Sequence, residues 1–347
     1  MEIAYEVRPF DDEVRAAYLA LLPEQAEAIE AGKLNWKFRD SPAGQGWVAL
    51  ARDTATGEIV GMNGFAPGRA KLGGVRVPAY QSMDTIVTPA ARGKGVFTRL
   101  VQAFYDAQDR IGGTVFYGFP NDNSAPGFFN RLGWERLGSP PFVIKPLRSG
   151  YFARKVLGDW AGFLNLPLSV VGRPRADIRD IERFDERADP LWNAFSAGLY
   201  CGLDRTHDYL NWRIFDHPAA SYKTRGIFGE HNDLKTFVTT HIGERQGGVI
   251  GSVMEALCRP DSRHDLQLLL TDALADMRSQ GADAALAWCA PHSPSWPVFR
   301  RLGFLPMPEA LRPIHLHFGV RALSADGVAA TVGPEAWYLS YLDSDTL

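Results

Sequence analysis

Residues 84–100 of this 347-residue chain read Asp84-Thr85-Ile86-Val87-Thr88-Pro89-Ala90-Ala91-Arg92-Gly93-Lys94-Gly95-Val96-Phe97-Thr98-Arg99-Leu100. A run rich in β-branched residues ends at a proline, and a short basic loop with two glycines follows. Apolar residues then recur with helical spacing at positions 96, 97, 100, 101, 104, 107 and 111, which predicts a strand, a loop and a helix. Amides freed by Gly93 and Gly95 can face an anion at the positive end of the helix dipole, and the neighbouring Arg92 and Lys94 add full charges. A diphosphate would fit such a loop.

Size and composition limit the classes of protein that remain. The length favours two domains, and a hydrophobic content of 46% is enough to bury real cores. A formal charge of -3 gives no general attraction to nucleic acid or to an anionic membrane, and no apolar run approaches the roughly 20 residues of a membrane helix. We therefore expect neither partner. The oligomeric state stays open.

The cysteines and the N-terminus bear on the compartment. Cys201, Cys258 and Cys289 are odd in number and far apart, which argues against a disulfide framework and favours a reducing environment. They also lack metal-ligand spacing, so no metal site is expected. The first residues show no basic segment followed by an apolar run, as a secretory signal would. We expect a cytoplasmic protein.

Several further elements follow from patterning. We expect a strand over 3–7 and a helix from about Val14 capped by Asp11 or Asp12. Further strands are expected over 47–52, 59–65 and 114–119, with a turn at Gly73-Gly74 before the strand that ends at Val87. Around 148–176 the composition changes to a possible helix over 151–164 and a proline-bearing connector. This predicts an N-terminal domain 1–147, a linker 148–176 and a C-terminal domain 177–347.

The first half recurs in the second. Leu34–Ala43 matches Leu210–Ala219 at an offset of 176 with six of ten positions identical, and Phe129–Trp134 matches Phe299–Phe304 at an offset of 170. Matches in the same order at a nearly constant offset indicate a tandem duplication, with accidental similarity as the alternative. The second copy has no glycine in the junction 258–265 that corresponds to the loop. Only the first copy is predicted to bind a diphosphate.

The strand, the Arg-x-x-Gly-x loop and helix, and the later Asn-rich turn before Leu132-Gly133-Trp134 together resemble the GNAT superfamily of acyl-CoA-dependent N-acyltransferases. The resemblance covers about residues 3–147 by motif and 177–320 by internal repetition. It implies a mixed α/β (α+β) fold, duplicated in tandem, each copy a central, largely antiparallel mixed sheet flanked by helices. The segments Leu34–Lys37 and Gly118–Asn121 look like a branch that acylates amino sugars in surface-polysaccharide biosynthesis.

The resemblance also implies a mechanism and a set of binding residues. An amine attacks the thioester of acetyl-CoA or another acyl-CoA directly, and the backbone amide of Val87 or its neighbour stabilises the oxyanion. The pantetheine arm pairs with the strand edge and the pyrophosphate rests on the loop. The residues implied to contact CoA are Ile86, Val87, Thr88, Arg92, Gly93, Lys94, Gly95, Val96, Phe97, Thr98, Asn121, Asn123 and Ser124.

Two positions depart from the family pattern. Phe97 stands where the signature ends in Gly or Ala, so the start of the helix is bulkier. The tyrosine that many relatives use as general acid toward the CoA thiolate aligns with Phe129, and with Phe299 in the second copy. No protonating tyrosine is therefore expected at that place.

The proton acceptor for the amine is the least determined part of the site. Asp84 is the candidate base or amine anchor, with a hydrogen-bonded structural role as the alternative, and strand alternation would place it on the side of Ile86 and Thr88. All eight histidines follow residue 200, so a histidine near substrate must come from the second copy. His207 and His292 are the candidates retained for substrate contact.

Three functions remain open. The first is an acyl-CoA-dependent N-acyltransferase, or acetyltransferase, acting on a small-molecule amine, with a nucleotide-linked amino sugar as the first choice of acceptor. The second is an aminoacyl-tRNA-dependent peptidyl transferase of tandem-GNAT type, which the diphosphate loop and the charge of -3 disfavour. The third is a non-catalytic acyl-CoA sensor, which the missing tyrosine favours.

Overall fold

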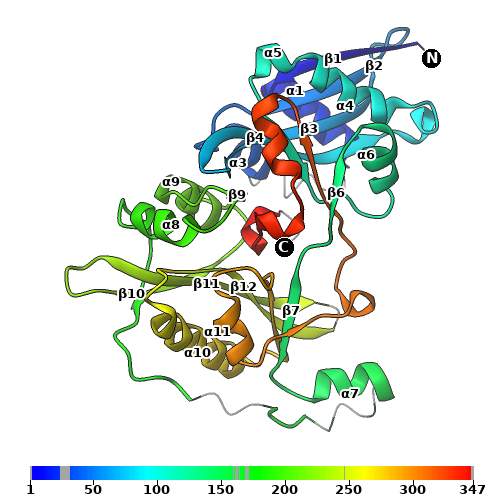
Figure 1. The fold of residues 1–347 in the computed structure, drawn as a ribbon. Coiled ribbons are helices and arrows are strands. Elements are labelled where there is room, and N and C mark those ends of the chain that lie inside the picture. The colour runs from blue at the N-terminus through cyan, green and yellow to red at the C-terminus, as the bar shows by residue number, and fades with distance from the viewer. Residues whose placement is uncertain are drawn as a thin grey trace.

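The computed structural model describes residues 2–23, 32–158, 160, 163, 165–168, 172–245 and 247–344, and arranges them around two mixed β-sheets (Figure 1). The strands are β1 (Ile3–Pro9), β2 (Trp47–Asp53), β3 (Ile59–Leu72), β4 (Val75–Val87), β5 (Val115–Gly118), β6 (Glu135–Gly138), β7 (Phe142–Pro146), β8 (Arg179–Asp180), β9 (Cys201–Leu203), β10 (Lys223–Phe228), β11 (Leu234–Arg245), β12 (Gly248–Cys258), β13 (Ala284–Trp288), β14 (Leu305–Pro306), β15 (Phe318–Ala322) and β16 (Trp337–Tyr338). The α-helices are α1 (Asp12–Leu21), α3 (Leu34–Phe38), α4 (Val96–Asp106), α5 (Gln108–Ile111), α6 (Ala125–Arg131), α7 (Gly150–Leu157), α8 (Ala188–Ser196), α9 (His207–Leu210), α10 (Arg263–Ser279) and α11 (Trp296–Arg301). Shorter helical turns are η3 (Pro89–Ala91), η5 (Asn211–Phe215), η6 (Glu309–Leu311), η7 (Ala325–Thr331), η8 (Pro334–Ala336) and η9 (Tyr341–Asp343).

The first sheet holds the stretch that opened the sequence. Its strands run β1-β2-β3-β4-β5-β15-β6, antiparallel except for the parallel pair β4–β5, and β9 with β16 extends it beside β3. Helix α4 turns its apolar stripe toward this sheet, where Leu100, Val101 and Phe104 are fully buried. The predicted strand, loop and helix order of residues 84–100 is therefore confirmed.

The second sheet repeats this order strand for strand. It runs β8-β10-β11-β12-β13-β7-β14, and again its one parallel pair, β12–β13, lies in the same position as β4–β5. Helix α10 lies against this sheet as α4 lies against the first. The expected fold, two largely antiparallel mixed sheets flanked by helices, is confirmed, and the matching topology supports the tandem duplication.

The two halves exchange one strand each, which the sequence patterns did not indicate. Strand β7 comes from the first half yet lies between β13 and β14, while β15 comes from the second half and lies between β5 and β6. Figure 1 shows the chain passing from β6 in one half to β7 in the other. The link from β6 to β7 is Ser139-Pro140-Pro141, and consecutive prolines favour an extended path over a tight hairpin. The proposed division at 148–176 thus separates sequence repeats, while each sheet is completed across it.

The segment after β7 begins as a helix, as predicted. Helix α7 spans Gly150–Leu157 and ends before Gly158, whose φ of 92° is a left-handed value that glycine tolerates. The expected helix ran to residue 164, whereas α7 ends at Leu157; of the remaining predicted residues, 159, 161, 162 and 164 lie outside the described residues.

A symmetric tryptophan pair joins the halves. Trp36 and Trp212, which the sequence repeat places 176 residues apart, stack with ring centroids 4.7 Å apart. Each indole N–H donates to the backbone carbonyl of the other residue, at 2.7 and 2.8 Å. Equivalent residues thus meet across a local two-fold relation between the copies.

Candidate active site

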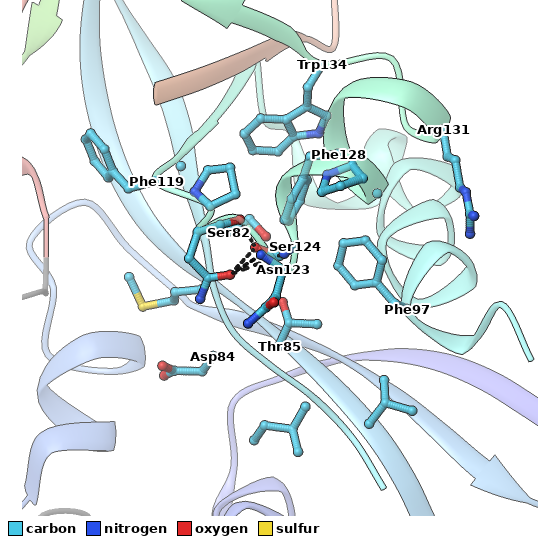
Figure 2. Close-up of a pocket in the computed structure, with 18 of the residues that line it drawn as sticks. Ser82, Asp84, Thr85, Phe97, Phe119, Asn123, Ser124, Phe128, Arg131 and Trp134 are labelled. Carbon is cyan, nitrogen blue, oxygen red and sulfur yellow. Dashed lines mark hydrogen bonds between the residues drawn. The ribbon is translucent and has the colours of Figure 1, made fainter. Parts of the chain in front are cut away.

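A large open cavity lies where β4 and β5 separate. Their parallel pairing ends at Gln81 opposite Tyr117, and β4 continues to Val87 while β5 stops at Gly118. The cavity between them measures about 920 Å³ (Figure 2). Because β4 has no neighbour in β5 beyond Gln81, its backbone edge is available to a ligand along this length.

The cavity gathers many of the residues that the sequence nominated. Those in its wall are Asp84, Ile86, Val87, Arg92, Phe97, Asn121, Asn123 and Ser124. Thr88, Gly93, Lys94, Gly95, Val96 and Thr98 do not line it. Among these, Gly93, Lys94 and Gly95 are exposed in the loop beyond Arg92, and Val96 is the buried first residue of α4.

The loop has the backbone that its glycines predict. Gly93 and Gly95 both have φ of 74°, and a side chain built on either would meet open space. Helix α4 begins directly after Gly95 without a side-chain cap, so its first amides stay available to an external acceptor. Arg92 turns back, donating from Nε to the carbonyl oxygen of Val87 at 3.1 Å.

The amide of Val87 points into the space between the strands. The neighbouring Thr88 N–H donates to Val60 of β3 at 2.9 Å. Since successive N–H groups of an antiparallel strand alternate between its two edges, the Val87 N–H faces away from β3, toward the β5 side. A carbonyl oxygen in the cavity could accept from it.

Asp84 occupies a bulge, which corrects the expected strand alternation. Its φ is 51°, and the β3–β4 register shifts so that Asp84 and Thr85 together oppose the single residue Asn63. The carboxylate accepts from Lys37 Nζ at 3.1 Å. Figure 2 shows it turned away from Ser82, Asn123 and Ser124. The two-residue alternation that grouped Asp84 with Ile86 fails because a bulge inserts an extra residue.

The Asn-rich turn is held together by its own side chains. The Asn121 side-chain oxygen accepts from the backbone amides of Asn123 and Ser124 at 3.1 and 3.2 Å. Ser124 precedes α6, but its hydroxyl bonds Asn121 and makes no helix cap. The turn forms one wall of the cavity.

Aromatic residues fill the space opposite the loop. Phe97 lies edge-on to Phe128 with centroids 5.1 Å apart, and its ring occupies the place that a side chain at Gly127 would need. The bulk at position 97 is thus matched by a glycine across from it. Phe129 points elsewhere, against Arg136 and His317.

Few ionisable groups line the cavity. Within the described parts of the chain they are Asp84, Arg92 and Arg131, with no tyrosine, histidine or cysteine. This leaves Asp84 as the carboxylate nearest the strand edge.

The two nominated histidines have other partners. His207 bonds Asp189 at 2.9 Å, and this hydrogen bond raises the pKa of His207. His292 bonds the carbonyl oxygen of Trp337 at 2.8 Å. Neither lines the cavity.

The equivalent opening in the second copy is closed. Only about 10 Å³ remains beside Met254, Glu255 and Trp288, where β12 and β13 separate. The chain's own C-terminal segment occupies this place: Tyr338 and Ser340 both donate from their hydroxyls to the Glu255 carboxylate. The copy that lacks the glycine loop thus also lacks an open slot.

Two further features concern metals and membranes. No group of three or more His, Cys, Asp or Glu side chains within the described ranges could hold a metal ion. Over the same ranges no helix has both the length and the apolar character needed to cross a membrane.

Comparison with known families identifies the first copy. Residues 7–137 match the family described as an acetyltransferase (GNAT) domain. This match contains the glycine loop and both strands of the open slot. A search of curated protein sequences finds no significant match.

Solved structures extend the likeness over both copies. A conserved protein of unknown function from Enterococcus faecalis V583, described as a probable N-acyltransferase, aligns at 12% identity and a TM-score of 0.62 over 92% of this chain and 73% of its own. Saccharomyces cerevisiae N-myristoyltransferase with bound myristoyl-CoA aligns at 13% identity and a TM-score of 0.59 over 91% and 82%. At such identities these structures show a shared fold.

The family match and the slot together define the class of protein. Residues 7–137 match the acetyltransferase (GNAT) domain family, and the described chain shares its fold over both halves with a probable N-acyltransferase and an N-myristoyltransferase.

Two basic residues near the cavity, Lys37 and Arg213, were not predicted from the sequence as site residues. Lys37 holds Asp84, and Arg213 lies close by, although neither was nominated as a site residue. The signal was present, because Lys37 and Arg213 are equivalent positions of the repeat at its offset of 176. A basic residue kept in both copies beside the same tryptophan could have drawn attention to them.

Proposed function

We propose that the slot between β4 and β5 binds acetyl-CoA or another acyl-CoA, with the pyrophosphate at Arg92–Thr98 and the thioester beside Ile86 and Val87. The supporting observation is the open cavity of about 920 Å³ that ends at a glycine loop and an uncapped helix N-terminus. The pantetheine arm would pair with the unpaired edge of β4 and pass the turn of Asn121, Asn123 and Ser124.

The reaction is proposed as a direct transfer. The amine lone pair attacks the thioester carbonyl carbon, a C–N bond forms, the C–S bond breaks, and CoA leaves as a thiolate. The Val87 N–H would donate to the oxyanion that forms on the carbonyl oxygen. The attacking nitrogen loses a proton as it becomes an amide nitrogen, and the leaving thiolate gains one, so the transfer balances without a tyrosine acid.

Asp84 is proposed to hold the amine and to accept its proton. Asp84 is the carboxylate in the cavity wall. It lies in the bulge of β4, and its side chain forms an ion pair with Lys37 of α3. The ion pair fixes the position of the carboxylate, which general-base catalysis requires. His207 and His292 have no part in this proposal.

The acceptor is proposed to be a small-molecule primary amine. The amino-sugar nucleotide stays a hypothesis that rests on the segments Leu34–Lys37 and Gly118–Asn121. A cytoplasmic location stays a prediction of the same kind, from the cysteines and the N-terminus.

Calorimetric titration with acetyl-CoA and CoA, followed by thiol release with a panel of amines, tests the proposal. We expect binding of both CoA species and thiol release that requires an amine. Absence of binding would refute the acyl-CoA site. Binding without thiol release on any amine would favour the sensor, which the lack of a tyrosine in the slot also favours.

A further inference from the structure

A second, smaller cavity shares part of β4 with the acyl-CoA slot. It measures about 30 Å³, and Gln81 and Met83 of β4 line both spaces. The first copy adds Trp36 and Lys37, the second adds Tyr209, Trp212 and Arg213, and the C-terminal segment adds Leu342 and Ser344. The two copies thus build this cavity jointly.

Arg213 in its wall is a buried cation with unused hydrogen-bonding capacity. The residue is 4% exposed. Its Nε donates to the Leu342 carbonyl oxygen at 2.9 Å and Nη2 donates to the Ser344 carbonyl oxygen. Its Nη1 is buried without a hydrogen-bond partner, and no carboxylate of the described residues pairs with it. A buried charge without a counter-ion is costly, so an anion beside it would be strongly favoured.

The other polar groups around the cavity also donate. The Lys37 side chain, 6% exposed, bonds Asp84. Burial raises the pKa of Tyr209 to about 12 and that of Tyr117 well above its usual value, so both hydroxyls keep their protons. Both hydroxyls already have acceptors, since Tyr209 donates to the Leu342 carbonyl oxygen at 3.2 Å and Tyr117 to the Gln81 side-chain oxygen at 3.4 Å. The nearby carboxylates of the described residues are also held, Asp84 by Lys37 and Asp343 by Arg205, so Nη1 of Arg213 is a donor left without a partner. The volume suits about two waters or a single carboxylate group.

We propose that this cavity binds a carboxylate of the acceptor substrate through Arg213, so that the acceptor is an amine that also carries a carboxylate, as an amino acid or a peptide does. The inference rests on the proposed function, because the amine must reach the thioester across Gln81 and Met83. The cavity is too small for a diphosphate, which separates this class from nucleotide-linked amino sugars. The two cations near the amine would also favour its neutral, nucleophilic form.

Bisubstrate conjugates test the inference while the natural acceptor is still unidentified. CoA is joined through its sulfur to an acetyl amide whose nitrogen carries a short chain ending in a carboxylate, and each conjugate is matched with its carboxamide. Chain lengths from one to four methylenes cover the reach from the slot to the cavity. Calorimetry measures the dissociation constant of each pair.

We expect at least one carboxylate conjugate to bind about 10- to 100-fold more tightly than its carboxamide, the range for a charge-assisted hydrogen-bonded pair. In Arg213→Gln the dissociation constants of that pair should differ by no more than about threefold. Arg213→Lys should keep part of the preference, and Arg300→Gln, at an exposed position of α11, should leave it unchanged.

Two results would overturn the inference: carboxylate and carboxamide conjugates that bind alike at every length, or a preference that survives Arg213→Gln. Free CoA separates this from the proposed function. If CoA binds wild type and Arg213→Gln equally while no preference is found, only the carboxylate site fails. If CoA does not bind at all, the acyl-CoA slot itself fails.

Discussion

The phosphate loop can be tested by one substitution with a matched control. Gly95 and Gly112 both have φ of 74°, both are exposed, and a side chain on either would meet no atom within 4 Å. Gly95 precedes α4 at the mouth of the slot, whereas Gly112 ends α5 away from it. Glutamate at either position introduces the same left-handed backbone strain, about 1–2 kcal/mol.

The two variants should differ in their affinity for CoA. At Gly95 the added carboxylate would stand about 4 Å from the proposed pyrophosphate, where each like-charge pair costs about 1 kcal/mol in water. Two phosphate charges give about 2 kcal/mol, or about 30-fold weaker CoA binding at low salt. Gly112→Glu should bind CoA like wild type.

Calorimetry at low and moderate salt measures the binding, and thermal unfolding measures the shared strain. The melting temperatures of Gly95→Glu and Gly112→Glu should fall together by a few degrees. Gly95→Ala, which adds strain without charge, should bind more tightly than Gly95→Glu. Equal CoA affinity of Gly95→Glu and Gly112→Glu would refute the placement of the pyrophosphate.

Three more outcomes are expected. Asp84→Asn should lower kcat by about 100-fold or more while leaving acetyl-CoA affinity unchanged, as loss of a general base predicts; unchanged turnover would remove Asp84 from the mechanism. Trp36→Ala should destabilise the fold by about 3–5 kcal/mol in chemical unfolding, and the cost should be non-additive with Trp212→Ala because the rings stack and exchange hydrogen bonds. The hydrogen bond to Asp189 raises the pKa of His207. The contribution of this pair to the free energy of unfolding is therefore fully present below the unfolded-state pKa of about 6.5 and is lost as the pH rises through the folded-state pKa. Asp189→Asn should therefore destabilise at pH 6 and have little effect at pH 9, and a pH-independent loss would contradict this.

The parts of the fold that could be predicted from sequence are those with local causes. Gly93 and Gly95 predicted the loop because a left-handed backbone is costly for other residues. The helical spacing of Leu100, Val101 and Phe104 predicted the buried face of α4. The repeat of Leu34–Ala43 revealed the duplication because equivalent residues serve the same contact, the stacked tryptophans.

The parts that could not be predicted depend on distant pairing. The exchange of β7 and β15 leaves each strand with an ordinary pattern, and nothing local states which sheet it joins. The bulge at Asp84 follows from its register against β3, so alternation counted along one strand does not hold at this residue. The place of Arg213 in a cavity wall depends on contacts between the two copies and the C-terminal segment, which no local pattern indicates.

Contacts in the closed slot of the second copy hold the C-terminal segment beside Arg213. Arg205, fully buried, donates from Nε to Glu255 at 2.7 Å and from Nη2 to Asp343 at 2.8 Å. These bonds anchor the C-terminal segment where the first copy has its open slot, since Glu255 lies on β12 just as Asp84 lies on β4. The anchored segment then presents the Leu342 and Ser344 carbonyl oxygens to Arg213. A slot that no longer has an anion loop thus serves to orient the guanidinium beside the proposed acceptor cavity, which gives the duplicated half a role in the reaction of the first.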